Sequence, residues 1–120
     1  MCTVLVLSNL ALAKRKVKEA FVSDIRLLTA EDEAVARDKF TKSGGVDIAV
    51  LDDELPDDAG EKMLSFIRKS GSETPVVMMG SKTESDRVLR CFALGADDYV
   101  EYGVSAELLR AKIHVLMRRG

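Results

Sequence analysis

Acidic side chains are concentrated in one short stretch of the chain, and they are the residues best suited to chemistry. Within IAVLDDELPDDAG, residues 48–60, five carboxylates fall within seven positions, at Asp52, Asp53, Glu54, Asp57 and Asp58. Carboxylate oxygens are typical ligands of Mg²⁺, and a carboxylate can also attack a phosphorus centre as a nucleophile. The cluster directly follows an apolar run, so it lies at the exit of a predicted buried strand. A solvated loop that does no chemistry is the alternative interpretation.

Four apolar runs and a weaker fifth predict the strands that would position these acids. They are Val4–Leu7, Ile25–Thr29, Ile48–Leu51, Val76–Met79 and Tyr99–Val100. The runs are apolar throughout instead of alternating with polar residues, which is typical of parallel strands covered by helices on both faces.

The segments between and after these runs have helical character. Their apolar stripes are Ala13, Val17, Ala20 and Phe21; Met63, Leu64 and Ile67; Val88, Leu89 and Phe92; and the inward-facing Leu108, Leu109, Ile113 and Leu116. Strand and helix therefore alternate along the chain, in units long enough for right-handed crossovers. We predict an α/β fold, a doubly wound (βα)5 parallel sheet that forms one domain over residues 1–120.

This fold also predicts where a ligand would bind. In open α/β sheets, ligands lie beyond the carboxyl ends of the strands. The segments at those ends are Ser8–Asn9, Asp52–Glu54, Gly80–Ser81 and Glu101–Tyr102. The acidic cluster is therefore expected at the functional edge of the sheet.

Composition excludes several classes of protein. With 47% hydrophobic and 32% charged residues, the 120-residue chain is typical of a globular domain and not of a disordered tail. The net charge of −2 does not favour nucleic-acid binding. Two cysteines, Cys2 and Cys91, without metal-ligand spacing argue against a structural disulfide or a zinc site. We expect a cytoplasmic protein without a membrane segment or a signal peptide.

Long motifs in a fixed order resemble one family, the receiver domain of two-component response regulators. They are VDIAVLDDELPDDAGEKML, TPVVMMGS, DRVLRCFALGADDYV and LLRAKIHVLMRRG, and the last two are similar to the OmpR/PhoB subfamily. The resemblance covers the whole chain and implies a flavodoxin-like fold with a regulatory, non-enzymatic role. It places the phosphoacceptor at Asp52, followed by Pro56 and Gly60 at the family's spacing.

The chain departs from the family at the residues that support phosphorylation. Ser8 and Asn9 stand where receivers carry an acidic pair, Gly80 replaces the hydroxyl residue, and Tyr102 replaces the lysine. A tyrosine is neutral at pH 7 and supplies no positive charge. We therefore expect an atypical receiver with weak or absent phosphorylation of Asp52.

The resemblance implies Mg²⁺ as the cofactor, and the lost acids predict weak binding at most. The candidate ligands are Asp52, Glu54 and Asn9. The alternative is a working receiver in which Asp52 is phosphorylated and Glu54 or Asp53 replaces the missing ligands. Side chains 52 and 54 would lie on the same side of the strand if it continued that far.

The resemblance also implies a switch and an interface. Tyr99 matches the family's switch aromatic, and Ser81 is the hydroxyl nearest to the position of Gly80. Arg87, Asp97, Asp98 and Lys112 match charged residues of a homodimer interface formed by the fourth helix, the fifth strand and the fifth helix. The other implied partners are a histidine kinase and, through a DNA-binding output domain after residue 120, DNA.

A third hypothesis is a small α/β enzyme or a flavin carrier. A flavodoxin-like phosphate loop would show a run rich in Ser, Thr and Gly after the first strand, where SNLALAK stands. An acid phosphatase of the Asp-x-Asp type would need an acidic pair at the end of that strand. Neither pattern is present, so we favour the atypical receiver.

Overall fold

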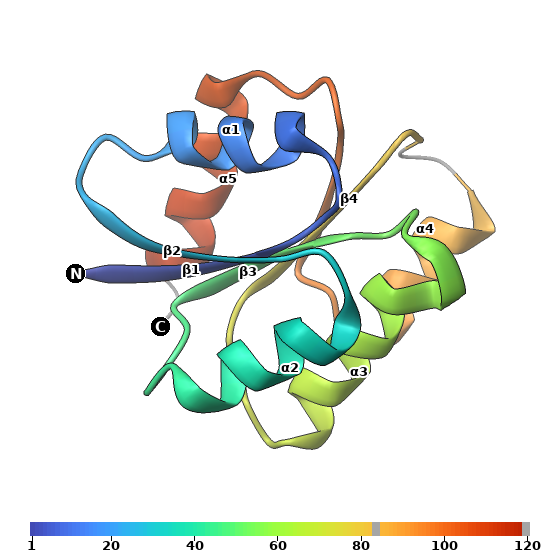
Figure 1. Ribbon diagram of the computed structural model, residues 1–120. Coiled ribbons are helices and arrows are strands. Elements are labelled where there is room, and N and C mark those ends of the chain that lie inside the picture. The colour runs from blue at the N-terminus through green and yellow to red at the C-terminus, as the bar shows by residue number, and fades with distance from the viewer. Residues whose placement is uncertain (83–84, 119–120) are drawn as a thin grey trace.

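The strands lie side by side in one sheet in a computed structural model that describes residues 1–82 and 85–118 (Figure 1). The order is β2-β1-β3-β4-β5, and every pairing is parallel. The strands are β1 (Cys2–Leu7), β2 (Ile25–Ala30), β3 (Ile48–Asp52), β4 (Val76–Gly80) and β5 (Asp98–Glu101). The predicted doubly wound (βα)5 sheet is confirmed.

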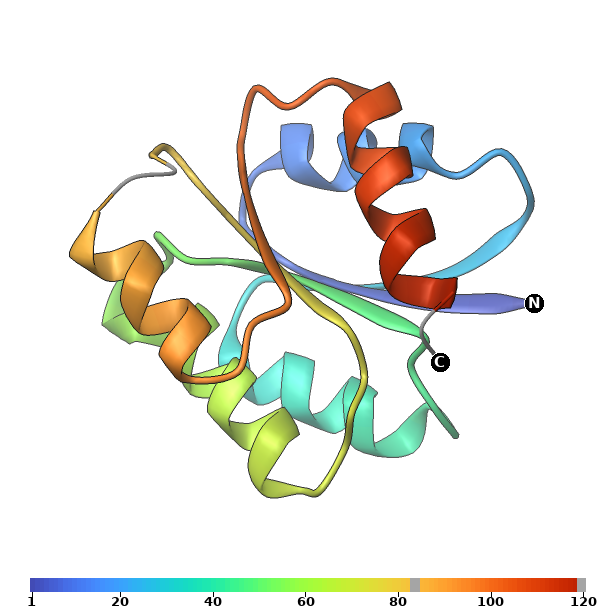
Figure 2. The ribbon, with the colours of Figure 1, turned by 180° about the vertical axis from the view of Figure 1, so that it is seen from behind.

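Helices cover both faces of the sheet. They are α1 (Ala11–Ala20), α2 (Glu33–Lys42), α3 (Ala59–Lys69), α4 (Asp86–Ala93) and α5 (Ala106–Arg118), with a short 3₁₀ turn, η1 (Pro56–Asp58), before α3. Helices α1 and α5 lie on one face, and α2, α3 and α4 lie on the other (Figures 1 and 2). This arrangement explains why the strands are apolar on both sides.

The alternation of side chains along β3 sets the geometry of the site. Ile48 and Val50 pack on the side of α1 and α5, whereas Ala49 and Leu51 pack on the side of α2 and α3. Because successive side chains of a strand point to opposite faces, the two acids that follow are expected to separate. Asp52 belongs to the first side, and Asp53 belongs to the second.

The inward face of α5 is narrower than the sequence predicted. Leu109, Ile113 and Leu116 are buried, at the spacing of one helical face. The prediction that Leu108 faces inward is wrong, since 50% of this residue is exposed. Leu108 precedes the buried stripe by one position and is therefore rotated by about 100° around the helix.

One glycine allows α3 to begin directly against the end of β3. A Cβ atom on Gly60 would lie 2.3 Å from the carbonyl oxygen of Asp52. Any side chain here would push α3 away from the acidic cluster. Glycine at position 60 is therefore required by close backbone packing beside the site.

None of the helices in residues 1–82 and 85–118 has the length and apolar character needed to cross a bilayer.

Candidate functional site

Asp52, the predicted phosphoacceptor, is the last residue of β3 and is only 2% exposed. Its Oδ2 accepts a hydrogen bond from Ser8 Oγ at 2.8 Å. Its Oδ1 accepts two, from Tyr102 Oη at 2.5 Å and from the backbone N–H of Glu54 at 2.9 Å. A carboxylate offers about four acceptor positions. Most of those of Asp52 are therefore taken by donors of the same chain.

Tyr102 lies where the resemblance places a lysine, and it contacts Asp52 as a neutral donor. Burial, followed by the hydrogen bond to the Asp52 carboxylate, raises the pKa of Tyr102. The phenol therefore keeps its proton at neutral pH. On the other side of Asp52, Ser8 Oγ also accepts the backbone N–H of Leu10 at 3.1 Å, which holds the hydroxyl at the start of α1.

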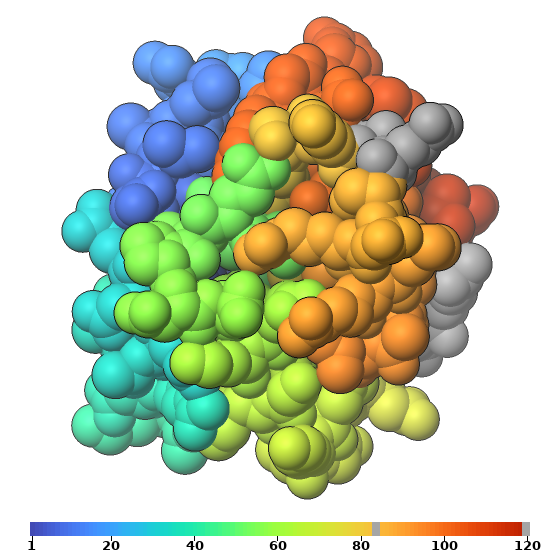
Figure 3. All heavy atoms as spheres, turned by 90° about the vertical axis from the view of Figure 1, so that its right-hand side faces the viewer, coloured from blue at the N-terminus to red at the C-terminus, as the bar shows by residue number. Residues whose placement is uncertain are grey.

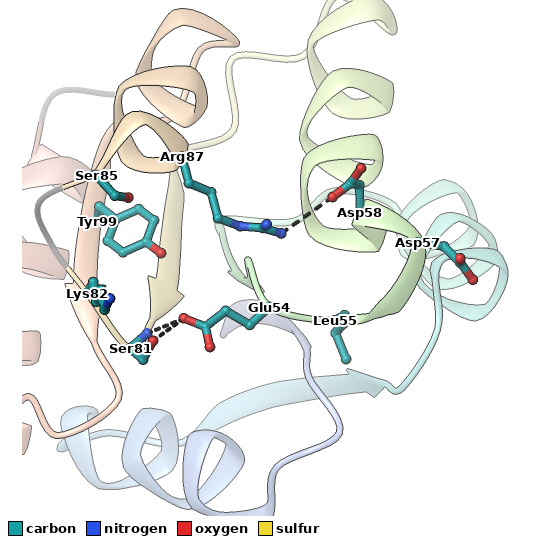
Figure 4. A pocket seen from close by; sticks show the side chains of 9 residues that line it. All are labelled: Glu54, Leu55, Asp57, Asp58, Ser81, Lys82, Ser85, Arg87 and Tyr99. Atoms are coloured by element: carbon teal, nitrogen blue, oxygen red, sulfur yellow. Dashed lines mark hydrogen bonds and ion pairs between the residues drawn. The ribbon is translucent and has the colours of Figure 1, made fainter.

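Glu54 points away from Asp52 and toward the end of β4. Its Oε2 accepts the backbone N–H of Ser81 at 2.6 Å and the Ser81 hydroxyl at 2.5 Å (Figure 4). These two hydrogen bonds lower the pKa of Glu54. Strand β3 ends at Asp52, so the expected strand alternation does not extend to Glu54. Asn9, the other predicted ligand, is exposed at the end of β1.

Asp53 forms a second polar network on the opposite face of β3. It is fully buried, and its Oδ2 accepts hydrogen bonds from Tyr99 Oη at 2.9 Å and from Arg87 Nε at 3.0 Å. Arg87 Nη2 also donates to the backbone carbonyl of Asp53 at 2.5 Å. On the other oxygen, Oδ1, Asp53 accepts the thiol of Cys91 at 3.4 Å. The Arg87 guanidinium supplies the counter-charge that a buried carboxylate needs.

Asp53, Cys91 and Glu61 bring three possible metal-ligand atoms within 4.8 Å of one another. Each carboxylate already has a cation close to it, Arg87 at 3.0 Å from Asp53 and Arg90 at 3.2 Å from Glu61. Burial and the nearby Asp53 carboxylate raise the pKa of Cys91 to about 12, so this residue is a neutral thiol at pH 7. Zinc and other soft metals need the thiolate. The charges and the proton of this group therefore fit a buried polar cluster better than a metal centre.

A cavity of about 570 Å³ opens between the segment after β3 and the start of α4 (Figures 3 and 4). Glu54, Ser81, Lys82, Arg87 and Tyr99 contribute to its lining. Acidic and basic side chains face each other across it. Arg87 reaches over the cavity toward Asp58, whose Oδ1 lies 3.4 Å from Nη2.

The residues predicted for the dimer interface form ion pairs within the chain. Lys112 of α5 pairs with Asp98 of β5 at 3.1 Å, and Arg68 of α3 pairs with Asp97 at 2.9 Å. Arg87 is engaged by Asp53, on the inner side of α4. The exposed side of α4 carries apolar residues, since Leu89 is 68% exposed and Phe92 is 45% exposed.

The sequence interpretation did not assign a role to Cys91 or an inward contact to Arg87. Strict alternation after Leu51 could have indicated that Asp53 faces the side opposite to Asp52. No local pattern indicates which residue of a helix reaches it, because that depends on how α4 packs over the sheet.

Comparison with known proteins identifies the family. Residues 4–114 match the response regulator receiver domain. The transcriptional regulatory protein CiaR of Streptococcus pneumoniae is 37% identical over 65% of this chain and 35% of its own length. The virulence transcriptional regulatory protein PhoP of Salmonella typhimurium is 29% identical over 99% of this chain and 53% of its own length. The chain thus spans about half, or less, of these curated relatives.

Solved structures agree with the sequence comparison. The BeF3-activated receiver domain of DrrB, an OmpR/PhoB homologue from Thermotoga maritima, superimposes with a TM-score of 0.84. It is 27% identical over 99% of both chains. A response regulator from the same organism has a TM-score of 0.86 at 19% identity over 98% of both chains, which supports the fold alone. The chain belongs to the response regulator receiver domain family, and its relatives are of the OmpR/PhoB type.

Proposed function

We propose that this chain is an atypical receiver domain that signals through protein–protein contacts, with weak or no phosphorylation of Asp52. The proposal is supported chiefly by the hydrogen bonds that the Asp52 carboxylate accepts. Both of its oxygens accept hydrogen bonds from the chain itself, including one from Tyr102 at the family's lysine position. Three donors thus leave about one acceptor position of the carboxylate for a phosphoryl group or a metal ion.

The charges that phosphorylation requires are also poorly supplied. Transfer to a carboxylate brings two anions together, so metal ions and fixed cations normally stabilise the transition state. Tyr102 is neutral, and the pKa shift keeps it so. Receiver domains bind Mg²⁺ through acidic residues, whereas here Glu54 is bound to Ser81 and Ser8 donates to Asp52. In this conformation Asp52 and its neighbours fit a Mg²⁺ site poorly.

The alternative is a working receiver in which Glu54 or Asp53 replaces the lost ligands. It would require Glu54 to leave the two hydrogen bonds from Ser81. It would also require Asp53 to leave Arg87 and turn to the other face of β3. Both changes remove charge-assisted hydrogen bonds, so we favour the atypical receiver.

The output we propose is the regulation of transcription. CiaR and PhoP, which the chain resembles, are named as transcriptional regulatory proteins. Each is longer than the matched segment, consistent with an output domain beyond the receiver. By analogy, such a domain would contact DNA, and a histidine kinase would be the upstream partner.

The contact surface we propose is the face formed by α4, β5 and α5, used in a homodimer. Its exposed apolar residues include Leu89, Phe92 and Leu108. A two-fold interface uses the same patch on both subunits, so an apolar patch is self-complementary. The Lys112–Asp98 ion pair at its margin lies within one chain. We therefore expect affinity to come from the apolar residues, with the charges affecting register.

Sedimentation velocity without any phosphoryl donor tests this proposal. We expect reversible dimers of the wild-type chain, with the same dissociation constant for Asp52→Asn. Leu89→Ser should weaken the dimer by about tenfold or more, because central apolar residues contribute most of the binding free energy.

Val22→Ser is the matched control, since Val22 is also an exposed aliphatic residue, 84% accessible, but lies in the segment after α1. It should leave the dissociation constant unchanged. A monomer at all concentrations, or a dimer that depends on Asp52, would contradict the proposed mode of signalling.

A further inference from the structure

The end of β3, helix α4 and strand β5 meet at the buried carboxylate of Asp53. Tyr99 reaches it from β5 and Arg87 reaches it from α4, with contacts of 2.9 Å and 3.0 Å to the same oxygen. The second Arg87 contact, to the Asp53 carbonyl, fixes the guanidinium in one orientation. Two charge-assisted contacts from one guanidinium fix direction as well as distance.

Gly80 provides the space that the Tyr99 ring occupies. A Cβ atom at position 80 would lie 2.1 Å from Tyr99 Oη and 3.0 Å from its ring carbon Cζ. A side chain at position 80 would therefore require the ring to shift from its present place. With glycine there, Tyr99 is 7% exposed and its hydroxyl points toward Asp53. Glycine, at the position where the resemblance places a hydroxyl residue, therefore leaves room for the buried ring.

Among the residues that the structure describes, helix α4 presents few other buried side chains to the sheet. Of its eight residues only Val88 and Cys91 are buried, and Cys91 itself donates to Asp53. The Arg87 contacts bind the first turn of α4 to the end of β3. The position of α4 therefore depends on the Asp53 network.

We infer that Asp53, Arg87 and Tyr99 form a latch that keeps Tyr99 buried against Gly80 and holds α4 in one position without a phosphoryl group. The latch rests on the proposed phosphorylation-independent function and deepens it, since it states what holds the contact face in one conformation. Asp53 is a positioning residue in this arrangement, and Tyr99 is a fixed part of the core instead of a moving switch.

Tyrosine fluorescence can report on the latch directly. The chain has no tryptophan and two tyrosines, so Tyr102→Phe leaves Tyr99 as the single emitter. Quenching by acrylamide then measures the exposure of its ring. We expect a quenching constant severalfold below that of free N-acetyltyrosinamide in the Tyr102→Phe protein, and a value close to the free compound when Gly80→Ala is added.

Gly103→Ala is the matched control for the glycine substitution. A Cβ atom at position 103 meets nothing within 4 Å, so this variant should quench like its parent. A readily quenched Tyr99 in the parent would overturn the latch. So would a folded Gly80→Ala variant that quenches no more than the parent.

A second measurement needs no glycine substitution. Burial and the hydrogen bond to Asp53 raise the pKa of Tyr99. In the Tyr102→Phe protein, phenolate absorbance should therefore stay absent through the ordinary tyrosine pKa of about 10 and appear only when the fold opens. A reversible titration near pH 10, with the circular dichroism of the folded protein unchanged, would overturn the latch.

Both measurements are made without a phosphoryl donor, so they are independent of the chemistry of Asp52. A buried Tyr99 in a protein that is phosphorylated would contradict the proposed function and leave the latch standing. An accessible Tyr99 in a protein that is not phosphorylated would overturn the latch alone.

Discussion

Replacing Arg87 by methionine removes the counter-charge of Asp53 and keeps most of the apolar length of the side chain. The substitution deletes the contacts of 3.0 Å to the Asp53 carboxylate and 2.5 Å to its carbonyl. Because Asp53 has no exposed surface, the carboxylate would remain buried and uncompensated. Removing one partner of a buried ion pair typically lowers the free energy of unfolding by about 3–5 kcal/mol.

The expected loss is smaller than that range for two structural reasons. The Arg87 side chain is 43% exposed, so solvent already screens part of the pair. Tyr99 and Cys91 would still donate to Asp53. We therefore expect Arg87→Met to lower the free energy of unfolding by about 2–3 kcal/mol, measured by urea denaturation followed by circular dichroism.

Lys42→Met is the matched control for this variant. Lys42 pairs with Asp38 at 2.9 Å, but both side chains are largely exposed, at 75% and 58%. This pair should contribute under about 1 kcal/mol. Adding Asp53→Asn to Arg87→Met should recover part of the loss, because the uncompensated charge is gone. Equal losses for Arg87→Met and Lys42→Met would refute the reasoning that Asp53 is a buried charge held by Arg87.

Two further predictions concern the same edge of the sheet. Tyr102→Phe should lower the free energy of unfolding by about 1–2 kcal/mol, since the buried Asp52 Oδ1 loses one donor; no loss in urea denaturation would show that the 2.5 Å contact is unimportant. The free energy of unfolding should also fall as the pH rises above 9.0. The pKa of Cys91 is about 12 in the folded protein against an ordinary value of 9.0, so the folded state keeps a proton that the unfolded state releases. The contribution is complete below pH 9.0 and is lost toward about pH 12, at up to about 1.4 kcal/mol per pH unit, and Cys91→Ser should flatten this decline.

The strands could be predicted from the sequence because parallel strands are apolar on both faces. Runs such as Ile48–Leu51 therefore identified the sheet and, with it, the edge where Asp52 lies. The resemblance predicted that the chain is a receiver domain, and the family match over residues 4–114 confirms this. Ser8 and Tyr102 come directly after predicted strands, which places them at the same edge of the sheet. Both donate hydrogen bonds to Asp52 there.

The contacts of individual side chains could not be predicted in the same way. The resemblance implies that Arg87 belongs to a dimer interface, and no motif indicates that its half-exposed side chain also pairs with the buried Asp53. That contact depends on the rotation of α4 about its axis. The same rotation leaves Leu89 exposed to solvent. The burial of Tyr99 depends on the empty volume at Gly80, a property of two neighbouring strands and not of either segment alone.

We propose above all that Asp52 is a hydrogen-bonded part of the core and not a working phosphoacceptor. Intact-mass spectrometry after incubation with Mg²⁺ and acetyl phosphate tests it most directly, with Asp52→Asn as the control and a receiver with a complete site to show that the donor is active. We expect an unchanged mass for the folded protein. An adduct of about one phosphoryl group that is absent from Asp52→Asn would contradict it.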